Sequence, residues 1–216
     1  MSTAIFDEIS LNLQQGRAKN VKDLVQQAVD TGHNVKDILE KGLLAGMDII
    51  GTKFKNNEVY VPEVLIAARA MKAGTDTLKP YMASSGVVSA GKVIVGTVKG
   101  DLHDIGKNLV KMMLEGKGLE VIDLGVDVSK EKFVEAVKEN DAGVIACSAL
   151  LTTTMSEMKG VVEALVTEGL RDKVKIMVGG APVTETFKNN IGADFYAPDA
   201  ASAAEEAVKY YKTAAV

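Results

Sequence analysis

The 216-residue sequence has few of the side chains that hold metal ions or form crosslinks. Its one cysteine is Cys147, and its two histidines are His33 and His103. A single cysteine excludes an intrachain disulfide and any zinc or iron–sulfur site that requires several cysteines. Two histidines also exclude a site built from several histidines. We expect Cys147, in the apolar run VIAC, to be buried and unreactive, and His33, at a break between helices, to be solvated or to cap a helix.

The sequence also lacks long apolar runs and a charge of one dominant sign. No run approaches the roughly 20 residues that a membrane-spanning helix needs, and the first residues, MSTAIFDEIS, do not resemble a secretory signal. We therefore expect a cytoplasmic protein without a membrane partner. Its 25 basic and 29 acidic residues are interspersed, so no basic stripe is available for nucleic acid. The hydrophobic content of 47% is enough for a globular core.

Apolar residues recur at intervals of three or four in the first 82 residues, which is typical of amphipathic helices. Gly32 is placed to end one helix, Asn34 to cap the next, and Pro62 to lie in the first turn of the last. This pattern predicts a four-helix bundle, with helices near residues 4–15, 21–31, 38–54 and 64–82.

Small uncharged residues at 83–91 mark the expected boundary, and a hinge, between a helical domain, 1–88, and a second domain, 89–216. In the second domain short apolar runs alternate with segments of helical length. This alternation predicts a Rossmann-like, flavodoxin-like α/β domain with a five-stranded parallel sheet covered on both faces. The expected strands are KVIVGTV, LEVIDLG, AGVIACS, VKIMVGG and ADFYAP, and the helices after them should start near Ile105, Lys130, Thr153, Thr184 and Ala200.

Ligands of such sheets bind where the strands end. The segment GDLHDIGK, residues 100–107, follows the first strand, but its spacing is not that of a phosphate-binding loop, and Asn108 replaces the required hydroxyl residue. The sequence also has no GxGxxG fingerprint for a nicotinamide cofactor. What distinguishes the segment is His103 between two acidic residues, Asp101 and Asp104.

His103 has two interpretations. It can be a solvated or helix-capping residue, or Asp101 can accept the proton of one ring nitrogen and leave the other nitrogen free as a metal ligand. A single histidine can hold a metal only if other ligands come from elsewhere, which points to a metal carried by a macrocycle. Lys107 and Lys111, on the helix that follows, are expected on a solvated face.

Two further strand ends are unusual. The third strand is followed by the segment SALLTTT, which contains four hydroxyl residues. One hydroxyl is enough to cap the next helix, so capping leaves the others unexplained. The fourth strand ends in Gly179 and Gly180, where missing side chains let a flat group approach the backbone. Each feature alone is also compatible with an ordinary cap or turn.

Together, the three strand ends resemble the cobalamin-binding signature of methyl-transferring corrinoid proteins and of the cobalamin module of methionine synthase. The spacing between the parts fits that family, and residues 43–74 resemble the helical cap domain that precedes its cobalamin domain. The parts are Asp101-x-His103-x-x-Gly106, Ser148-x-Leu150 and Gly179-Gly180.

The resemblance implies a bound cobalamin with His103 as the lower axial ligand of cobalt. Asp101 would hold the tautomer of His103, and Thr154 stands where the methionine synthase pattern has the serine that completes this relay. Ser148 and Leu150 would contact the lower base, and the glycines would open its slot. The implied cofactor-binding residues are Asp101, His103, Asp104, Ile105, Gly106, Ser148, Leu150, Thr152, Thr154, Gly179 and Gly180.

The resemblance also implies a methyl carrier with no catalytic residues of its own. Co(I) would take a methyl group from a donor-specific methyltransferase, and methyl-Co(III) would pass it to a second methyltransferase that acts on tetrahydrofolate or coenzyme M. A reductive activase would be a third partner, in one-carbon metabolism. The segments GGAPVT and SALLTTTM favour methylamine or betaine donors. A cobalamin-dependent sensor or regulator and an adenosylcobalamin isomerase subunit remain the alternatives.

Overall fold

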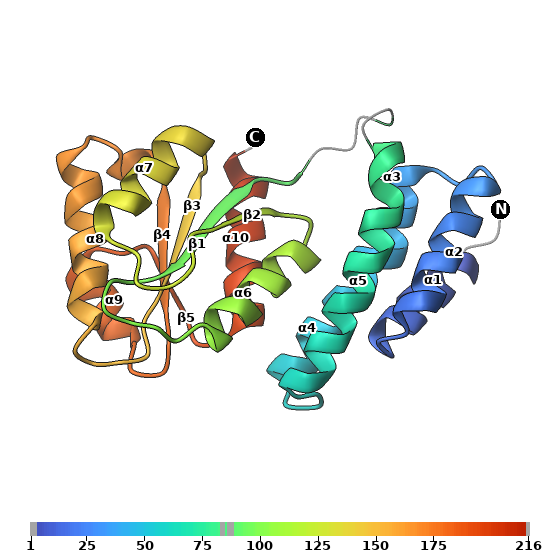
Figure 1. Ribbon diagram of the computed structural model, residues 1–216, viewed down its shortest axis with the longest axis horizontal. Coiled ribbons are helices and arrows are strands. Elements are labelled where there is room, and N and C mark those ends of the chain that lie inside the picture. Colours follow the sequence, from blue (N-terminus) through green and yellow to red (C-terminus); the bar gives the residue numbers. More distant parts are fainter. Residues whose placement is uncertain (1–3, 83–84, 86–88, 215–216) are drawn as a thin grey trace. The chain divides into compact units, whose positions relative to one another are not determined.

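The computed structural model describes residues 4–82, 85 and 89–214, and the chain divides into two compact units (Figure 1). The first unit consists mainly of Met1–Ser89, and the second of Ala90–Glu115 and Leu119–Val216. Residues 83–84 and 86–88 of the expected hinge lie outside the described residues. Within the described ranges, no helix is both long enough and apolar enough to span a bilayer.

The first unit is a helical bundle, as expected. Asn34 caps its third helix, since its side chain accepts hydrogen bonds from the backbone N–H groups of Lys36 and Asp37. Three helical segments, α3, η1 and α4, follow one another without a break, so the unit has four helical stretches in its described part. They are α1 (Ala4–Gln14), α2 (Ala18–Asp30), α3 (Val35–Asp37) with η1 (Ile38–Leu44) and α4 (Ala45–Lys55), and α5 (Val61–Met82).

The second unit confirms the predicted α/β fold. Its five strands are all parallel and lie in the order β2-β1-β3-β4-β5, which is the flavodoxin-like order. The strands are β1 (Lys92–Thr97), β2 (Glu120–Asp123), β3 (Val144–Ser148), β4 (Lys175–Gly179) and β5 (Phe195–Ala197). The helices are α6 (Ile105–Gly116), α7 (Lys130–Asn140), α8 (Met155–Thr167), α9 (Glu185–Ile191) and α10 (Ala200–Ala214), with a short turn of 3-10 helix, η3 (Arg171–Lys173).

The register of the sheet brings several strand ends into one row. Thr97 of β1 pairs with Ser148 of β3, Ser148 pairs with Gly179 of β4, and Gly179 pairs with Ala197 of β5. The loops that leave β1, β3 and β4 therefore start at the same edge of the sheet. These are the loops that carry the three parts of the signature.

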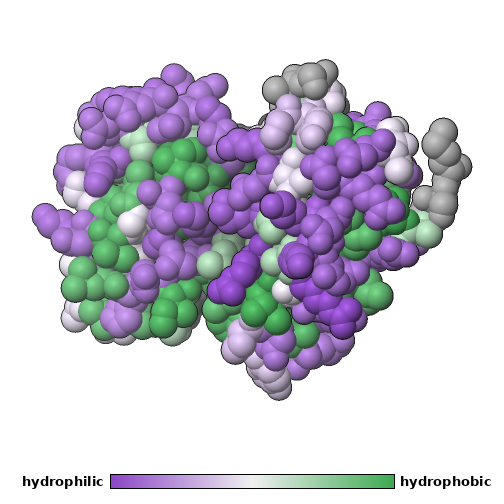
Figure 2. All heavy atoms as spheres, turned by 45° about the vertical axis from the view of Figure 1, so that its right-hand side comes forward, coloured by the Kyte–Doolittle hydropathy of each residue, from purple (hydrophilic) through white to green (hydrophobic). Residues whose placement is uncertain are grey.

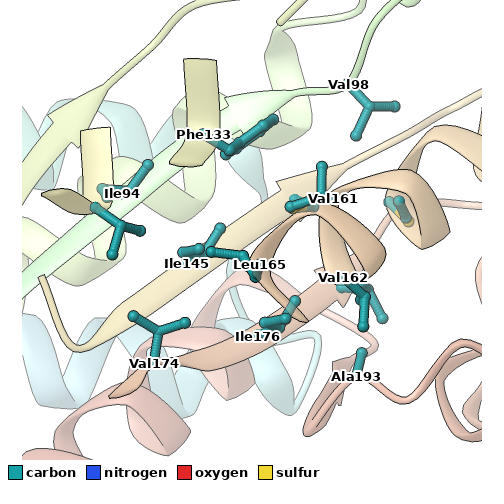
Figure 3. Close-up of a cluster of buried hydrophobic side chains, with 14 of the residues drawn as sticks. Ile94, Val98, Phe133, Ile145, Val161, Val162, Leu165, Val174, Ile176 and Ala193 are labelled. Carbon is teal, nitrogen blue, oxygen red and sulfur yellow. The ribbon is translucent and has the colours of Figure 1, made fainter. Parts of the chain in front are cut away.

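A buried apolar cluster of the second unit lies between the sheet and helices α7 and α8 (Figure 3). Ile94, Ile145 and Ile176 come from three neighbouring strands, and they meet Phe133 of α7 and Leu165 of α8. Continuous apolar strands of this kind are what a parallel sheet covered by helices requires. This core holds the strand ends in a fixed register.

Two helices start one or two residues later than the sequence predicts. Thr184 is the residue before α9, because its side chain accepts a hydrogen bond from the backbone N–H of Phe187 and so caps the helix from outside. Thr153 lies in a turn in which the backbone N–H of Thr154 donates to the carbonyl of Leu151, and α8 starts at Met155.

Large apolar side chains also reach the surface in both units. Figure 2 shows apolar patches between polar residues on one face of the molecule. In the first unit the exposed large hydrophobic residues are Leu11, Ile49, Tyr60, Leu65 and Ile66, and in the second they are Leu102, Ile105, Leu150, Leu151 and Val166. Four of the second set belong to the loops after β1 and β3 or to the start of α6.

Cys147 is buried in β3, as predicted, and burial raises the pKa of its thiol to about 12. Because the thiolate is the reactive form, we expect no reaction of the native protein with an aromatic disulfide reagent at pH 8. In denaturant the same reagent should titrate one thiol per chain. Rapid reaction of the native protein would contradict the buried position of β3.

Candidate functional site

The site is built on a tight turn that follows β1. The backbone N–H of Asp101 donates to the carbonyl of Val98 over 3.1 Å, and Gly100, the third residue of the turn, has a φ of +78°. A type II turn needs a positive φ at this position, which glycine adopts without strain. The turn buries Asp101 completely and leaves the side chain of His103 51% exposed.

Asp101 joins the loop after β1 to the loop after β3. Its Oδ1 accepts from the backbone N–H of His103 (3.1 Å) and lies 2.8 Å from the ring Nδ1 of the same residue. Its Oδ2 accepts from the backbone N–H groups of Leu150 (2.8 Å) and Leu151 (3.2 Å) and from the hydroxyl of Thr154 (2.8 Å). The threonine therefore makes the bond that the family's serine would make.

These bonds determine the charge of Asp101. Burial alone would raise its pKa, but hydrogen bonds from the Leu150 N–H, from the ring and the backbone of His103 and from the Thr154 hydroxyl outweigh burial. The pKa is held far below its usual value, so the carboxylate is ionised at neutral pH. An ionised carboxylate only accepts hydrogen bonds, and Nδ1 of His103 must therefore carry the proton.

In the neutral imidazole of His103 the lone pair therefore lies on Nε2. Across residues 4–82, 85 and 89–214, no hydrogen-bond partner of this nitrogen is found. The same residues contain no group of three or more His, Cys, Asp or Glu side chains that could hold a metal ion. The site can thus supply one nitrogen to a metal whose other ligands come with it.

Large apolar side chains are exposed in the segment of His103 and in the loop that bonds Asp101. Leu102 and Ile105, on either side of His103 in the chain, are 72% and 76% exposed, and Leu150 and Leu151, which bond Asp101, are 42% and 41% exposed. Large apolar side chains are seldom left in water around a polar group unless they meet a partner or ligand. These two loops therefore offer apolar surface to a ligand or a partner.

The remaining predicted residues lie in or next to the same loops. Asp104 is exposed and accepts from the side chain of Asn108 over 3.1 Å, at the start of α6. Gly106 is exposed in the first turn of α6, and a Cβ placed there would meet no atom within 4 Å. Ser148 is the half-buried last residue of β3, and Thr152 is exposed.

Gly180 has a structural role that the sequence did not indicate. Its φ is +129°, and a Cβ at this position would lie 1.9 Å from the carbonyl oxygen of Ala149. The missing side chain therefore lets the loops after β3 and β4 touch through their backbones. Gly179 is also confined, since its Cβ would lie 3.1 Å from the carbonyl oxygen of Ala197.

Gly180→Ala is expected to lower the free energy of unfolding by about 2 kcal/mol or more, because a clash with backbone adds to an unfavourable φ. Gly106→Ala is the matched control, and its effect should stay within about 1 kcal/mol because the position is helical and open. Urea unfolding of the ligand-free proteins measures both. Equal stability of the two variants would contradict the close approach of the loops.

The prediction for Lys107 was wrong. This lysine is 3% exposed, and its Nζ donates to Asp123 Oδ1 over 2.6 Å and to Asn108 Oδ1 over 2.8 Å. Asp123, the last residue of β2, draws Lys107 inward, and it also bonds Lys111, which is one-third exposed. The ion pair ties α6 to β2 just beyond the segment that carries His103.

Comparison with known proteins identifies the family. B12 binding domain models match residues 91–208 and residues 5–79. A corrinoid protein of Desulfitobacterium hafniense is 41% identical over 97% of this chain and 98% of its own length. The dimethylamine corrinoid protein of Methanosarcina barkeri is 48% identical over 79% of this chain and 81% of its own.

A solved structure, the methanol:cobalamin methyltransferase complex MtaBC from Methanosarcina barkeri, matches with a TM-score of 0.87 and 28% identity. The match covers 97% of this chain and 80% of the matched chain. The resemblance carried by the three strand-end segments is thereby confirmed. The chain belongs to the B12-binding corrinoid proteins of methyltransferase systems.

Proposed function

We propose that this chain is a methyl carrier that binds cobalamin at the carboxyl edge of its sheet, with His103 as the lower axial ligand. The observation that carries the proposal is the arrangement of His103 itself. Asp101 holds a proton on Nδ1, so in the neutral, half-exposed ring the lone pair lies on Nε2. A ligating histidine needs this tautomer and a partner on its other nitrogen.

The residues present fit a corrinoid. Exposed apolar side chains in the segment of His103 and in the loop that bonds Asp101 offer surface on which a broad ring could rest. They are Leu102, Ile105, Leu150 and Leu151. The residues that would hold the cofactor and its tail are Asp104, Ile105, Gly106, Ser148, Leu150, Thr152, Gly179 and Gly180. A cobalamin held there would supply a nucleophilic cobalt for methyl transfer.

The chain's own residues would position the ligating ring of His103. Thr154 and the backbone N–H groups of Leu150 and Leu151 stabilise the Asp101 carboxylate, which in turn orients the ring of His103. Asp101 remains a hydrogen-bond acceptor throughout, because its low pKa keeps it unprotonated. No residue of this chain would break or form a bond to the methyl donor, so the chain is a carrier and not itself an enzyme.

The proposed partners follow from this role. A donor-specific methyltransferase would deliver the methyl group, a second methyltransferase would pass it to tetrahydrofolate or coenzyme M, and a reductive activase would restore oxidised cobalt. Methylamines are the donor class we favour, since relatives that cover most of the chain are named dimethylamine and trimethylamine corrinoid proteins.

A competition between cofactor forms tests the proposal against a sensor or an isomerase subunit. The chain is offered equimolar methylcobalamin and adenosylcobalamin in the dark, gel-filtered, and analysed for the form retained. A methyl carrier should retain methylcobalamin at least as well as the adenosyl form and give up its methyl group when a coenzyme M or tetrahydrofolate methyltransferase is added. Retention of the adenosyl form alone, without methyl transfer to either acceptor, would contradict the proposal.

A further inference from the structure

Thr97 holds the backbone of His103. It is the last residue of β1, it is completely buried, and its hydroxyl donates to the backbone carbonyl of His103 over 2.8 Å. A buried hydroxyl needs an acceptor, and Thr97 finds it six residues further along the chain. The bond fixes the main chain of His103 to the end of β1.

Asp127, in the loop between β2 and α7, holds the turn before His103. Its Oδ1 accepts from the backbone N–H of Gly100 over 2.7 Å, and its own N–H donates to the backbone carbonyl of Asp101 over 3.0 Å. One residue thus bonds two neighbouring residues of the turn, once through its side chain and once through its backbone.

The conformation of Asp127 suits this role. Its φ is +52°, a region that non-glycine residues rarely enter, although asparagine and aspartate do so more often than others. A residue remains there only when its surroundings demand it. Here the surrounding loop is bonded to the end of β1. The backbone N–H of Thr97 donates to the carbonyl of Gly125, and the backbone N–H of Val128 donates to the carbonyl of Thr97. Val128 also forms a parallel bridge with Val98.

We propose that Thr97 and Asp127 are positioning residues for His103. They hold the segment from Val98 to His103 so that the imidazole meets Asp101 and presents Nε2 before any ligand binds. Asp101 and His103 are two residues apart, so the bond between their side chains depends on the backbone between them. The inference rests on the proposed function and deepens it, because a ligand held in place beforehand binds its metal at a lower entropic cost.

Matched variants separate this role from folding. Asp127→Gly removes the acceptor but tolerates the positive φ, whereas Asp127→Asn keeps a side-chain oxygen and also tolerates it. Thr97→Val removes the hydroxyl at nearly constant shape, whereas Thr97→Ser keeps it. Asp127 is exposed, so substitutions there should leave the fold intact. If the buried Thr97→Val variant does not fold, the comparison of Asp127→Gly with Asp127→Asn still tests the inference.

The first readout needs no cofactor. In ligand-free protein labelled with ¹⁵N-histidine, a long-range ¹H–¹⁵N spectrum shows which ring nitrogen carries the proton. Wild type, Asp127→Asn and Thr97→Ser should show His103 with the proton on Nδ1 alone. Asp127→Gly and Thr97→Val should show a mixture of tautomers, while His33 stays unchanged in every variant.

The second readout is the visible spectrum of the hydroxocobalamin-loaded proteins, relative to His103→Ala. The loss of one net hydrogen bond should shift the balance toward histidine-free cobalt by about fivefold in Asp127→Gly and Thr97→Val, with the thermal midpoint little changed. Wild-type behaviour of both variants in both readouts, or equal shifts in Asp127→Gly and Asp127→Asn, would overturn the inference. A wild-type spectrum that does not depend on His103 would instead refute the proposed function, and the tautomer readout would still decide the roles of Thr97 and Asp127.

Discussion

Asp101→Asn is expected to lower the free energy of unfolding by about 3 kcal/mol, one of the two largest effects that we predict. The Asp101 carboxylate is buried and accepts bonds from three backbone N–H groups, the ring of His103 and the hydroxyl of Thr154. An asparagine amide would turn an N–H₂ group toward some of these donors and leave them without an acceptor. Urea unfolding at pH 7 measures the loss, and Asp104→Asn, at an exposed position, is the control with an expected change below about 0.5 kcal/mol.

The dependence of this effect on pH gives a second check. The pKa of Asp101 is lower in the folded protein than in the unfolded chain, where it is about 3.9. The stabilisation by the carboxylate is therefore fully present above the unfolded pKa and is lost as the pH falls toward the folded pKa. The gap in stability between wild type and Asp101→Asn should be constant from pH 7 to about pH 5 and shrink below about pH 4. A gap that stays constant down to pH 3 would contradict the low pKa.

His103→Ala should change the visible spectrum of the bound corrinoid completely. The variant has no imidazole to ligate cobalt, but the tail-binding residues of the loops after β3 and β4 are intact, so the cofactor should stay bound. Acidifying the wild type should produce the spectrum of the variant, because a protonated imidazole has no lone pair on Nε2. His33→Ala is the matched control, since His33 lies in the helical unit and bonds Thr31 and Ala28.

Two results would count against this assignment. Identical spectra of wild type and His103→Ala would show that His103 does not ligate cobalt. A change in His33→Ala as large as that in His103→Ala would show that the spectrum reports the fold and not the axial ligand.

Much of the fold could be predicted because it follows from local patterns. The alternation of apolar runs and helices predicts the parallel sheet, and the rule that ligands bind at strand ends points to the segments of His103, Ser148 and Gly179. Asp101 could be paired with His103 because only one residue separates them. The cap at Asn34 could be predicted for the same reason, since a cap bonds its own helix.

The rest of the site depends on contacts between distant segments. The bond from Thr154 to Asp101 spans 53 residues, and the bond from Gly100 to Asp127 spans 27, so no local pattern indicates them. Lys107 could be assigned to a solvated face from its helix alone, and only the position of Asp123 at the end of β2 explains its burial. Gly180 likewise requires the position of Ala149, which the pairing of β3 with β4 determines.

The central claim is that this chain holds a corrinoid through His103, and the most direct test is the amount of cofactor that survives desalting. The chain is incubated with excess hydroxocobalamin and gel-filtered, and cobalt and protein are quantified in the protein peak. We expect about one cobalt per chain, with a spectrum that differs from that of His103→Ala. A protein peak without cobalt would contradict the claim and leave the row of strand ends as a site for another ligand.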